Sequence, residues 1–209
     1  RGPQATGALK KFLVPFSECE SSFISTIEDL QPDPWVVPGE ERPQRASGAG
    51  YSIAVSLLEA ALPGQGARIL SFIGGPCTYG PGQVVGVRLE EMFRNFVDIQ
   101  KNNEYCKHVK KATKFYQSVA QRAIKSGITL DLFAFTLDQF GLLEMKSMFE
   151  KTGGICLTHE IFDGQIFRDT YKKIFEKDAN GDLKFGFCGD ITINLSPDLR
   201  IAGAIGPCT

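Results

Sequence analysis

Short apolar runs alternate with amphipathic stretches through the middle of the chain. Residues 69–73 and 128–135 are rich in β-forming residues and too short to be buried helices, so both are predicted strands. A third, shorter run follows at 155–157. Because these runs leave little room for a wet face, we expect the two longer ones to be central strands, with Ile69 and Leu132 fully buried.

Helical periodicity occupies the stretches between the predicted strands. The clearest case runs from about 103 to 126, where apolar residues recur at spacings of three and four and Gly127 stands at the C-cap position. An earlier helix is predicted from Ser17, which has capping-box spacing to Glu20. Further helices are predicted at 49–62, after Gln139 through 149, and at 164–175, and a short strand at 13–14.

The order of these elements predicts the fold class. From residue 49 to 175, helix and strand alternate, which is typical of an α/β fold with right-handed crossovers. We therefore expect a mostly parallel sheet with helices on both faces. Trp35 begins a proline-rich loop, and we expect this large aromatic side chain to anchor the loop to the core. The alternative is that Trp35 is an exposed anchor for a partner.

The pattern changes after residue 176. A turn at 178–182 is followed by alternating apolar and polar residues over 183–195, another turn, and an apolar run at 200–205. Strands of this kind after an α/β unit indicate the first strands of a β-sandwich. Residues 1–176 are thus predicted to form the α/β domain, and residues 177–209 the start of a second domain.

Composition narrows the classes of function. The formal net charge of −1 gives no basic face for nucleic acid, and no apolar run has membrane-spanning length or the form of a signal peptide. The six cysteines form no C-x-x-C pair, which favours reduced thiols in a cytosolic protein. The first residue is not Met, so we expect an excised fragment. Four lysines at 107, 110, 111 and 114 are interpreted as a solvated face, with an acidic partner or lipid as the alternative.

The loop at residues 74–82 stands where open α/β sheets usually bind ligands, at the carboxyl end of a strand. Its glycines and prolines end the strand, but it lacks the lysine of a phosphate-binding loop. Cys77 is its one side chain able to ionise near neutral pH, and the chain has only two histidines to pair with it. Residues 178–189 lack the glycine and glutamate of a calcium loop.

The order of elements resembles a von Willebrand factor A domain. That resemblance implies a metal held by a D-x-S-x-S loop, a threonine of T-x-T-G and an aspartate of T-D-G. Here Arg45-Ala46-Ser47-Gly48 fills the T-x-T-G place, Ile73-Gly74-Gly75 fills the T-D-G place, and D-x-S-x-S does not occur. Arg45 thus stands in place of a ligand, so we expect no metal. We expect Arg45 to bond carbonyls of loop 74–82 or the carboxylate of Asp138.

Six ordered motifs resemble the Sec23 family, the GTPase-activating subunits of the COPII inner coat. The motifs are R-P-Q-R-A-S-G from residue 42, G-A-R-I-L-S-F-I-G-G-P-C-T-Y-G-P-G from 66, K-K-A-T-K-F-Y from 110, L-D-Q-F-G-L-L-E-M-K from 137, T-G-G from 152 and G-A-I-G-P-C from 203. The resemblance covers the trunk domain, without its first strand, and the start of the β-sandwich.

The resemblance to the Sec23 family implies a structural role in transport from the endoplasmic reticulum to the Golgi. Its implied partners are the cargo-binding inner-coat subunit, a Sar-type small GTPase and the outer-coat subunit, without nucleic acid. Its implied location is the cytoplasm and, peripherally, the reticulum membrane. The family's catalytic arginine and zinc finger match no residue here, so no catalytic residue, metal ligand or cofactor is expected.

The residues expected to form a partner-binding loop are Arg45, Cys77, Thr78 and Tyr79. Two alternatives remain open from the sequence. One is a metal-dependent von Willebrand A-type ligand-binding module, and the other is an enzyme that uses Cys77.

Overall fold

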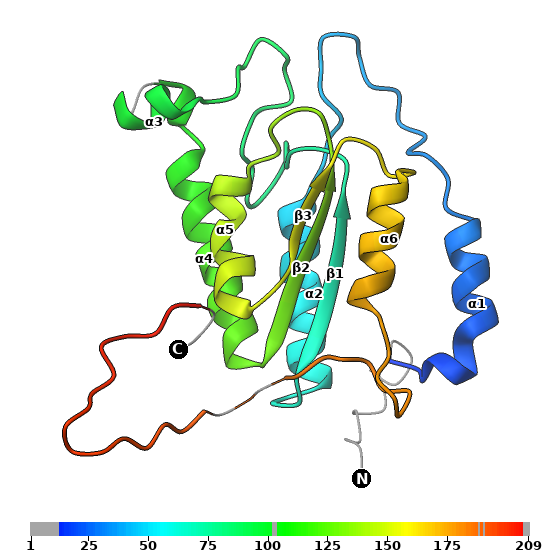
Figure 1. The fold of residues 1–209 in the computed structure, drawn as a ribbon. Helices are drawn as coiled ribbons and strands as arrows, with labels where there is room; N and C mark the ends of the chain where they lie inside the picture. The colour runs from blue at the N-terminus through cyan, green and yellow to red at the C-terminus, as the bar shows by residue number, and fades with distance from the viewer. Residues whose placement is uncertain (1–12, 102–103, 188, 190, 207–209) are drawn as a thin grey trace.

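Strand β2 (Ile128–Phe135) lies in the middle of a three-stranded sheet. The computed structural model describes residues 13–101, 104–187, 189 and 191–206. β1 (Ala67–Ile73) pairs in parallel with one edge of β2, and β3 (Cys156–His159) pairs in parallel with the other (Figure 1). All three strands therefore point the same way, and the loops that follow them emerge at one edge of the sheet.

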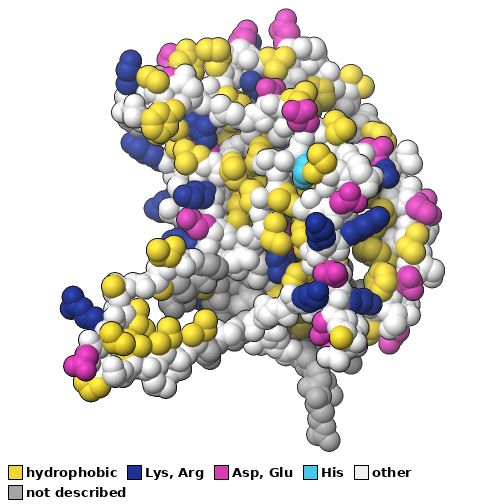
Figure 2. All heavy atoms as spheres, viewed as in Figure 1, with side chains coloured by type: hydrophobic (Ala, Val, Ile, Leu, Met, Phe, Trp, Pro, Cys, Tyr) yellow, Lys and Arg dark blue, Asp and Glu magenta, His cyan; other side chains and the backbone are white. Residues whose placement is uncertain are grey.

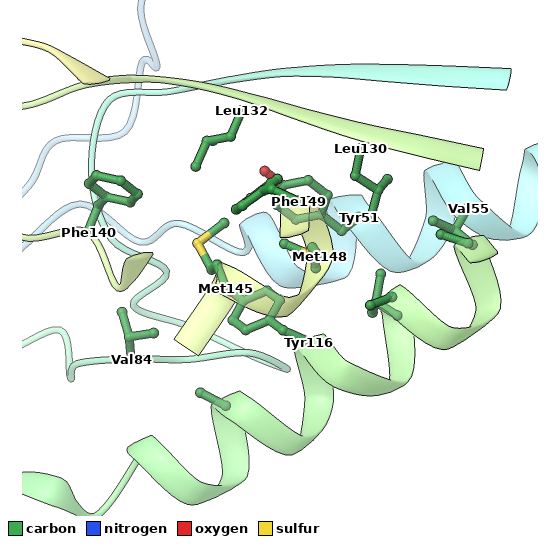
Figure 3. Close-up of a cluster of buried hydrophobic side chains, with 14 of the residues drawn as sticks. Tyr51, Val55, Val84, Tyr116, Leu130, Leu132, Phe140, Met145, Met148 and Phe149 are labelled. Atoms are coloured by element: carbon green, nitrogen blue, oxygen red, sulfur yellow. The ribbon is translucent and has the colours of Figure 1, made fainter. Parts of the chain in front are cut away.

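One face of β2 packs into the main core. Leu130, Leu132 and Ala134 are fully buried there, as alternate residues of a strand should be. They meet side chains of three helices, among them Tyr116 and Met148 (Figure 3). These helices are α2 (Ser47–Ala61), α4 (Val109–Lys125) and α5 (Leu142–Thr152).

The opposite face of β2 packs against α6 (Gln165–Ile174). The ring of Phe133 lies 6.0 Å from that of Phe167 and 5.5 Å from that of Tyr171, measured between centroids. Phe135 lies 4.8 Å from Phe167 in an edge-to-face arrangement. Helices thus cover both faces of a parallel sheet, and the predicted α/β fold class is confirmed (Figure 1).

The remaining helices lie at the margins of this core. They are α1 (Phe16–Glu28), the short α3 (Phe96–Lys101) and the 3₁₀ turn η2 (Glu104–Cys106). The predicted capping box of α1 does not form, because the helix begins at Phe16 and its N-cap is Pro15. Leu13 and Val14 form no strand, since no partner strand lies beside them in the described residues.

β1 is an edge strand among the described residues, and the prediction that it is central was wrong. Its only partner in the sheet is β2, so its other side is uncovered. Ile69 is accordingly half-buried rather than fully buried, and Phe72 is 45% exposed. Leu132 on β2 is 0% exposed, as predicted.

Trp35 does not anchor its loop to the core. Its side chain is 82% exposed, and the neighbouring Val36 is 92% exposed. No residue of α1 is buried either, although Phe23 and Ile27 give that helix an apolar face. Trp35 instead lines a pocket formed by its own loop, together with Val37, Pro38 and Arg42.

The segment 183–206 forms no strand in its described residues, contrary to the prediction. Its one ladder contact is an isolated antiparallel bridge between Lys177 and Leu183. Most of the segment is exposed and runs away from the sheet, with apolar side chains along it (Figures 1 and 2). A period-two pattern becomes a strand only when a second strand supplies hydrogen-bond partners. The predicted β-sandwich and the boundary near Glu176 therefore stay predictions.

Four cysteines within the described residues are free thiols, at positions 19, 77, 106 and 156. Cys188 and Cys208 lie outside the described residues. None of the described helices is both long and apolar enough to cross a membrane.

Candidate partner-binding edge of the sheet

The loop after β1 is held by hydrogen bonds that involve the buried Thr78 and the backbone of Arg45. Thr78 is 0% exposed, and its hydroxyl donates to the carbonyl oxygen of Pro43 at 2.6 Å. The same hydroxyl accepts a hydrogen bond from the backbone N–H of Arg45 at 2.9 Å. The N–H groups of Thr78 and Tyr79 both donate to the carbonyl of Arg45, at 3.0 and 3.1 Å. The loop is thereby fixed to the segment before α2.

Arg45 also contacts the loop through its side chain. Gly75 packs so closely against the guanidinium that a Cβ at that position would lie 2.9 Å from Nη1. The predicted contact between Arg45 and loop 74–82 is therefore present. The predicted hydrogen bonds are absent: within the described residues the guanidinium bonds neither a loop carbonyl nor Asp138. Only glycine at 75 leaves room for this packing.

Cys77 and Gly82 join the loop to the main core. The phenol of Tyr116 donates to the carbonyl oxygen of Gly82 at 2.9 Å, and Gly82 has a φ of +78° that favours glycine. Burial raises the pKa of Tyr116 above its usual value, so the phenol stays protonated and remains a donor. The Cys77 thiol is 2% exposed and points at the carbonyls of Tyr79 and Pro81.

The buried position of Cys77 does not suit a nucleophile. A nucleophilic thiol needs access to substrate and a base within hydrogen-bond reach. Among the bonds of the described residues, neither His108 nor His159 contacts Cys77. Its arrangement fits a thiol that fills space beneath the loop.

A second anchored loop follows β2, and its anchor was not predicted from the sequence. Arg94 is 7% exposed and forms a two-pronged ion pair with Glu144, at 3.0 Å from Nε and 2.6 Å from Nη2. Its Nη1 donates to Oε1 of Gln139 at 2.8 Å. The guanidinium thus ties residues 136–141 to the segment before α3. An arginine is usually exposed, and the carboxylate that pairs with Arg94 lies 50 residues away in the chain.

Each loop at this edge exposes large apolar side chains. Tyr79 after β1 is 60% exposed, and Leu137 after β2 is 82% exposed. Ile161 and Phe162 after β3 are 65% and 62% exposed. A depression of ≈ 400 Å³ lies beside Leu137 and is lined in part by Arg94 and Thr158. We call these four exposed residues the carboxyl-edge surface.

The carboxyl-edge surface does not fit a bound metal. No group of three or more His, Cys, Asp or Glu residues gathers anywhere in the described part of the chain. Beside Gly75, where a von Willebrand A-type metal would need anionic ligands, the cationic guanidinium of Arg45 is present instead. A fixed positive charge repels a divalent cation, so this geometry disfavours the metal-dependent alternative.

The structure divides the four sequence-derived candidates by their role. Cys77 and Thr78 are buried supports, and Arg45 joins the loop to the preceding segment. Tyr79 alone among them presents most of its side chain to solvent. Leu137, Ile161 and Phe162 were not predicted as partner-binding residues. Their position after predicted strands could have indicated that they lie at this edge.

Two comparisons with known proteins point to the same family. Residues 5–178 match the family described as the Sec23/Sec24 trunk domain. The chain is 43% identical over 210 residues to "Protein transport protein SEC23 F" of Arabidopsis thaliana. That alignment takes in 100% of this chain and 26% of the relative, so the chain spans about a quarter of the relative's length.

One solved structure shows a weaker likeness. The human COPII-coat protein Sec24c is similar over 77% of this chain and 20% of its own, with a TM-score of 0.45 and 15% sequence identity. At this level the likeness supports no conclusion about function.

Proposed function

Because this chain belongs to the Sec23/Sec24 trunk domain family, we propose that it is a structural part of a COPII coat subunit that acts in endoplasmic reticulum to Golgi transport. The observation that carries the proposal is the similarity along the entire chain, at 43% identity, to a protein named as a transport protein. The anchored loops and the lack of a catalytic group at the carboxyl-edge surface support a binding role over an enzymatic one.

The proposed partners are those of the coat. They are the cargo-binding inner-coat subunit, a Sar-type small GTPase and, through the assembled coat, the outer-coat subunit. Tyr79 and Leu137 are suitable contacts, since exposed aromatic and apolar side chains on a fixed scaffold contribute strongly at interfaces. Because the loops beneath them are already ordered, little conformational entropy is lost on binding.

The proposed location is the cytoplasm and, peripherally, the membrane of the endoplasmic reticulum and its vesicles. We assign stimulation of GTP hydrolysis to the complete subunit and to no residue of this chain. We also propose that these residues work without a resident cofactor.

A binding experiment tests the partner proposal. The full chain is captured with a GTP-loaded Sar-type GTPase and, separately, with the cargo-binding subunit. The variant Tyr79→Ala/Leu137→Ser should bind at least one of them about tenfold more weakly, a loss of about 1.4 kcal/mol. Ile53→Ser on α2 is the control, because Ile53 is 61% exposed and is not part of the carboxyl-edge surface. Equal binding by the two variants would exclude the carboxyl-edge surface as the interface.

A further inference from the structure

Helix α4 carries an unusual charge pattern for an exposed helix. Its 17 residues, Val109–Lys125, include five cations and no Asp or Glu, in a chain whose formal net charge is −1. Arg122 is paired with Glu59 of α2. The four lysines that remain are exposed and form no ion pair with any described residue, and we call them the lysine ridge: Lys110, Lys111, Lys114 and Lys125.

The lysine ridge follows one side of the helix. At about 100° per residue, its four positions fall within about a third of the helix circumference. The buried residues Ala112, Tyr116 and Val119 lie on the other side, against the core. Between the lysines the exposed positions are polar, with Gln117, Ser118 and Gln121. Lysine and arginine side chains are visible along the margin where α4 lies (Figures 1 and 2).

Three of these lysines are placed unfavourably for the helix itself, whereas Lys125 stands in the last turn, where a cation is favourable. The three lie in the first two turns, where the helix dipole presents partial positive charge. The first turn has no acidic residue and the N-cap His108 makes no side-chain capping bond. Their mutual repulsion adds to this cost. Local stability therefore does not explain the charge pattern, whereas binding of an anion would.

We propose that the lysine ridge is a docking surface for an acidic protein segment, rather than for a membrane. From Lys110 to Lys125 the ridge is about 22 Å long, which suits one acidic helix or extended segment. It has no exposed large apolar residue of the kind that interfacial helices insert into lipid. This inference is independent of the carboxyl-edge surface.

Two matched variants of the full chain test the inference. The first replaces the lysine ridge with K110Q, K111Q, K114Q and K125Q. The second removes the same charge elsewhere with K146Q, K151Q, K172Q and K173Q, whose lysines are exposed on α5 and α6. The probes are a labelled 16-residue poly-glutamate peptide and phosphatidylcholine vesicles containing phosphatidylserine. Circular dichroism confirms that each variant is folded.

The ridge variant should bind the peptide at least tenfold more weakly than the unchanged chain, and the control variant less than twofold more weakly. The thermal midpoint of the ridge variant should be equal to or above that of the unchanged chain, because three unfavourable charges leave the start of the helix and only one favourable charge leaves its end. An equal loss in both variants, or no peptide binding by the unchanged chain, overturns the inference. Vesicle binding that depends on the ridge without peptide binding also overturns it, in favour of lipid.

Discussion

At the scale of single residues, the predictions about stability concern the core of β2 and two charged clusters. Leu132 packs against α4 and α5 without solvent contact. Arg94 and Glu144 are a charged pair inside the protein, and Glu91 forms a more exposed ion pair with Lys107. Apolar burial, a buried ion pair and a surface cluster respond to different perturbations, so each gives its own prediction.

Replacing Leu132 with Ala should lower the free energy of unfolding by about 2–5 kcal/mol, from lost burial and the cavity left behind. The measurement is urea denaturation. Leu137→Ala is the control, because Leu137 is 82% exposed and should change stability by no more than about 0.5 kcal/mol. Similar midpoints for the two variants would mean that β2 is not the centre of the sheet.

Removing one half of the buried ion pair should be costly. Arg94→Met leaves the carboxylate of Glu144, which is 1% exposed, without its partner and should cost about 3–5 kcal/mol. The double variant Arg94→Met/Glu144→Leu should recover most of that loss, since no unpaired charge remains. A double-mutant cycle by chemical denaturation measures both. If the single variant costs less than about 1 kcal/mol, the pair is not buried as described.

Glu91 should make stability depend on pH in the acid range. Burial opposes its ionisation, but Lys107, the Gly86 N–H and His108 outweigh burial and lower the pKa of Glu91. A lowered folded-state pKa stabilises the protein above the unfolded-state pKa, and this contribution is lost as the pH falls through the folded value. Unfolding midpoints at pH 7 should therefore separate the unchanged chain from Glu91→Gln, and the difference should shrink below about pH 4. A constant difference would contradict this account.

At the scale of elements, the chain divides into packed and unpacked parts. The packed part consists of the three strands and the four helices that cover the two faces of the sheet: β1, β2, β3, α2, α4, α5 and α6. α1 and the segment 183–206 have apolar residues at regular spacing but bury few of them. The spacing of apolar residues therefore indicates which face of an element can be buried. Whether that face is buried depends on a second surface that packs against it.

The contrast between packed and unpacked elements can be measured with one substitution in each. Phe23→Ala on α1, where Phe23 is 51% exposed, should change the free energy of unfolding by no more than about 0.5 kcal/mol. Phe133→Ala on β2, where the ring is 0% exposed, should cost about 3–5 kcal/mol. Thermal and urea unfolding provide the comparison. A large loss for Phe23→Ala would show that α1 packs against the core in solution.

At the scale of the whole molecule, the described residues form a scaffold without a catalytic constellation. The buried Cys77 has no histidine partner and no cluster of metal-binding side chains occurs in the described residues. The carboxyl-edge surface and the lysine ridge are instead exposed surfaces of different chemistry, one apolar and one cationic.

We expect this chain alone not to accelerate GTP hydrolysis by a Sar-type GTPase. An arginine finger contributes roughly 10³- to 10⁵-fold in rate, and the family's catalytic arginine matches no residue here. A single-turnover assay with the GTP-loaded GTPase measures the rate with and without the chain. An acceleration approaching that size would refute the expectation, and replacement of Arg45 would then show whether that residue is responsible.

The sequence by itself determined the order and type of the packed elements. The predicted strand at 128–135 and the predicted helix at 164–175 are present as β2 and α6. The helix predicted from about 103 is present as α4, which begins only at Val109, after the 3₁₀ turn η2. A strong apolar period has one way to bury its face. The sequence also predicted that the loop after β1 lies at the carboxyl edge of the sheet, and the three parallel strands do end at that common edge.

Only the tertiary structure decided which apolar residues are buried and which charges meet. Large apolar side chains such as Trp35, Ile69 and those in segment 183–206 are of the kind usually buried in a core. Each needs a packing neighbour that the local sequence does not specify. The pairing of Arg94 with Glu144 joins residues 50 apart. The loop that contains Cys77 and Tyr79 is likewise held by long-range bonds, from Thr78 to Pro43 and from Tyr116 to Gly82. The local pattern of apolar residues determines which elements form and which face each can bury. Burial and ion pairing depend on surfaces that are distant in sequence and meet only on folding.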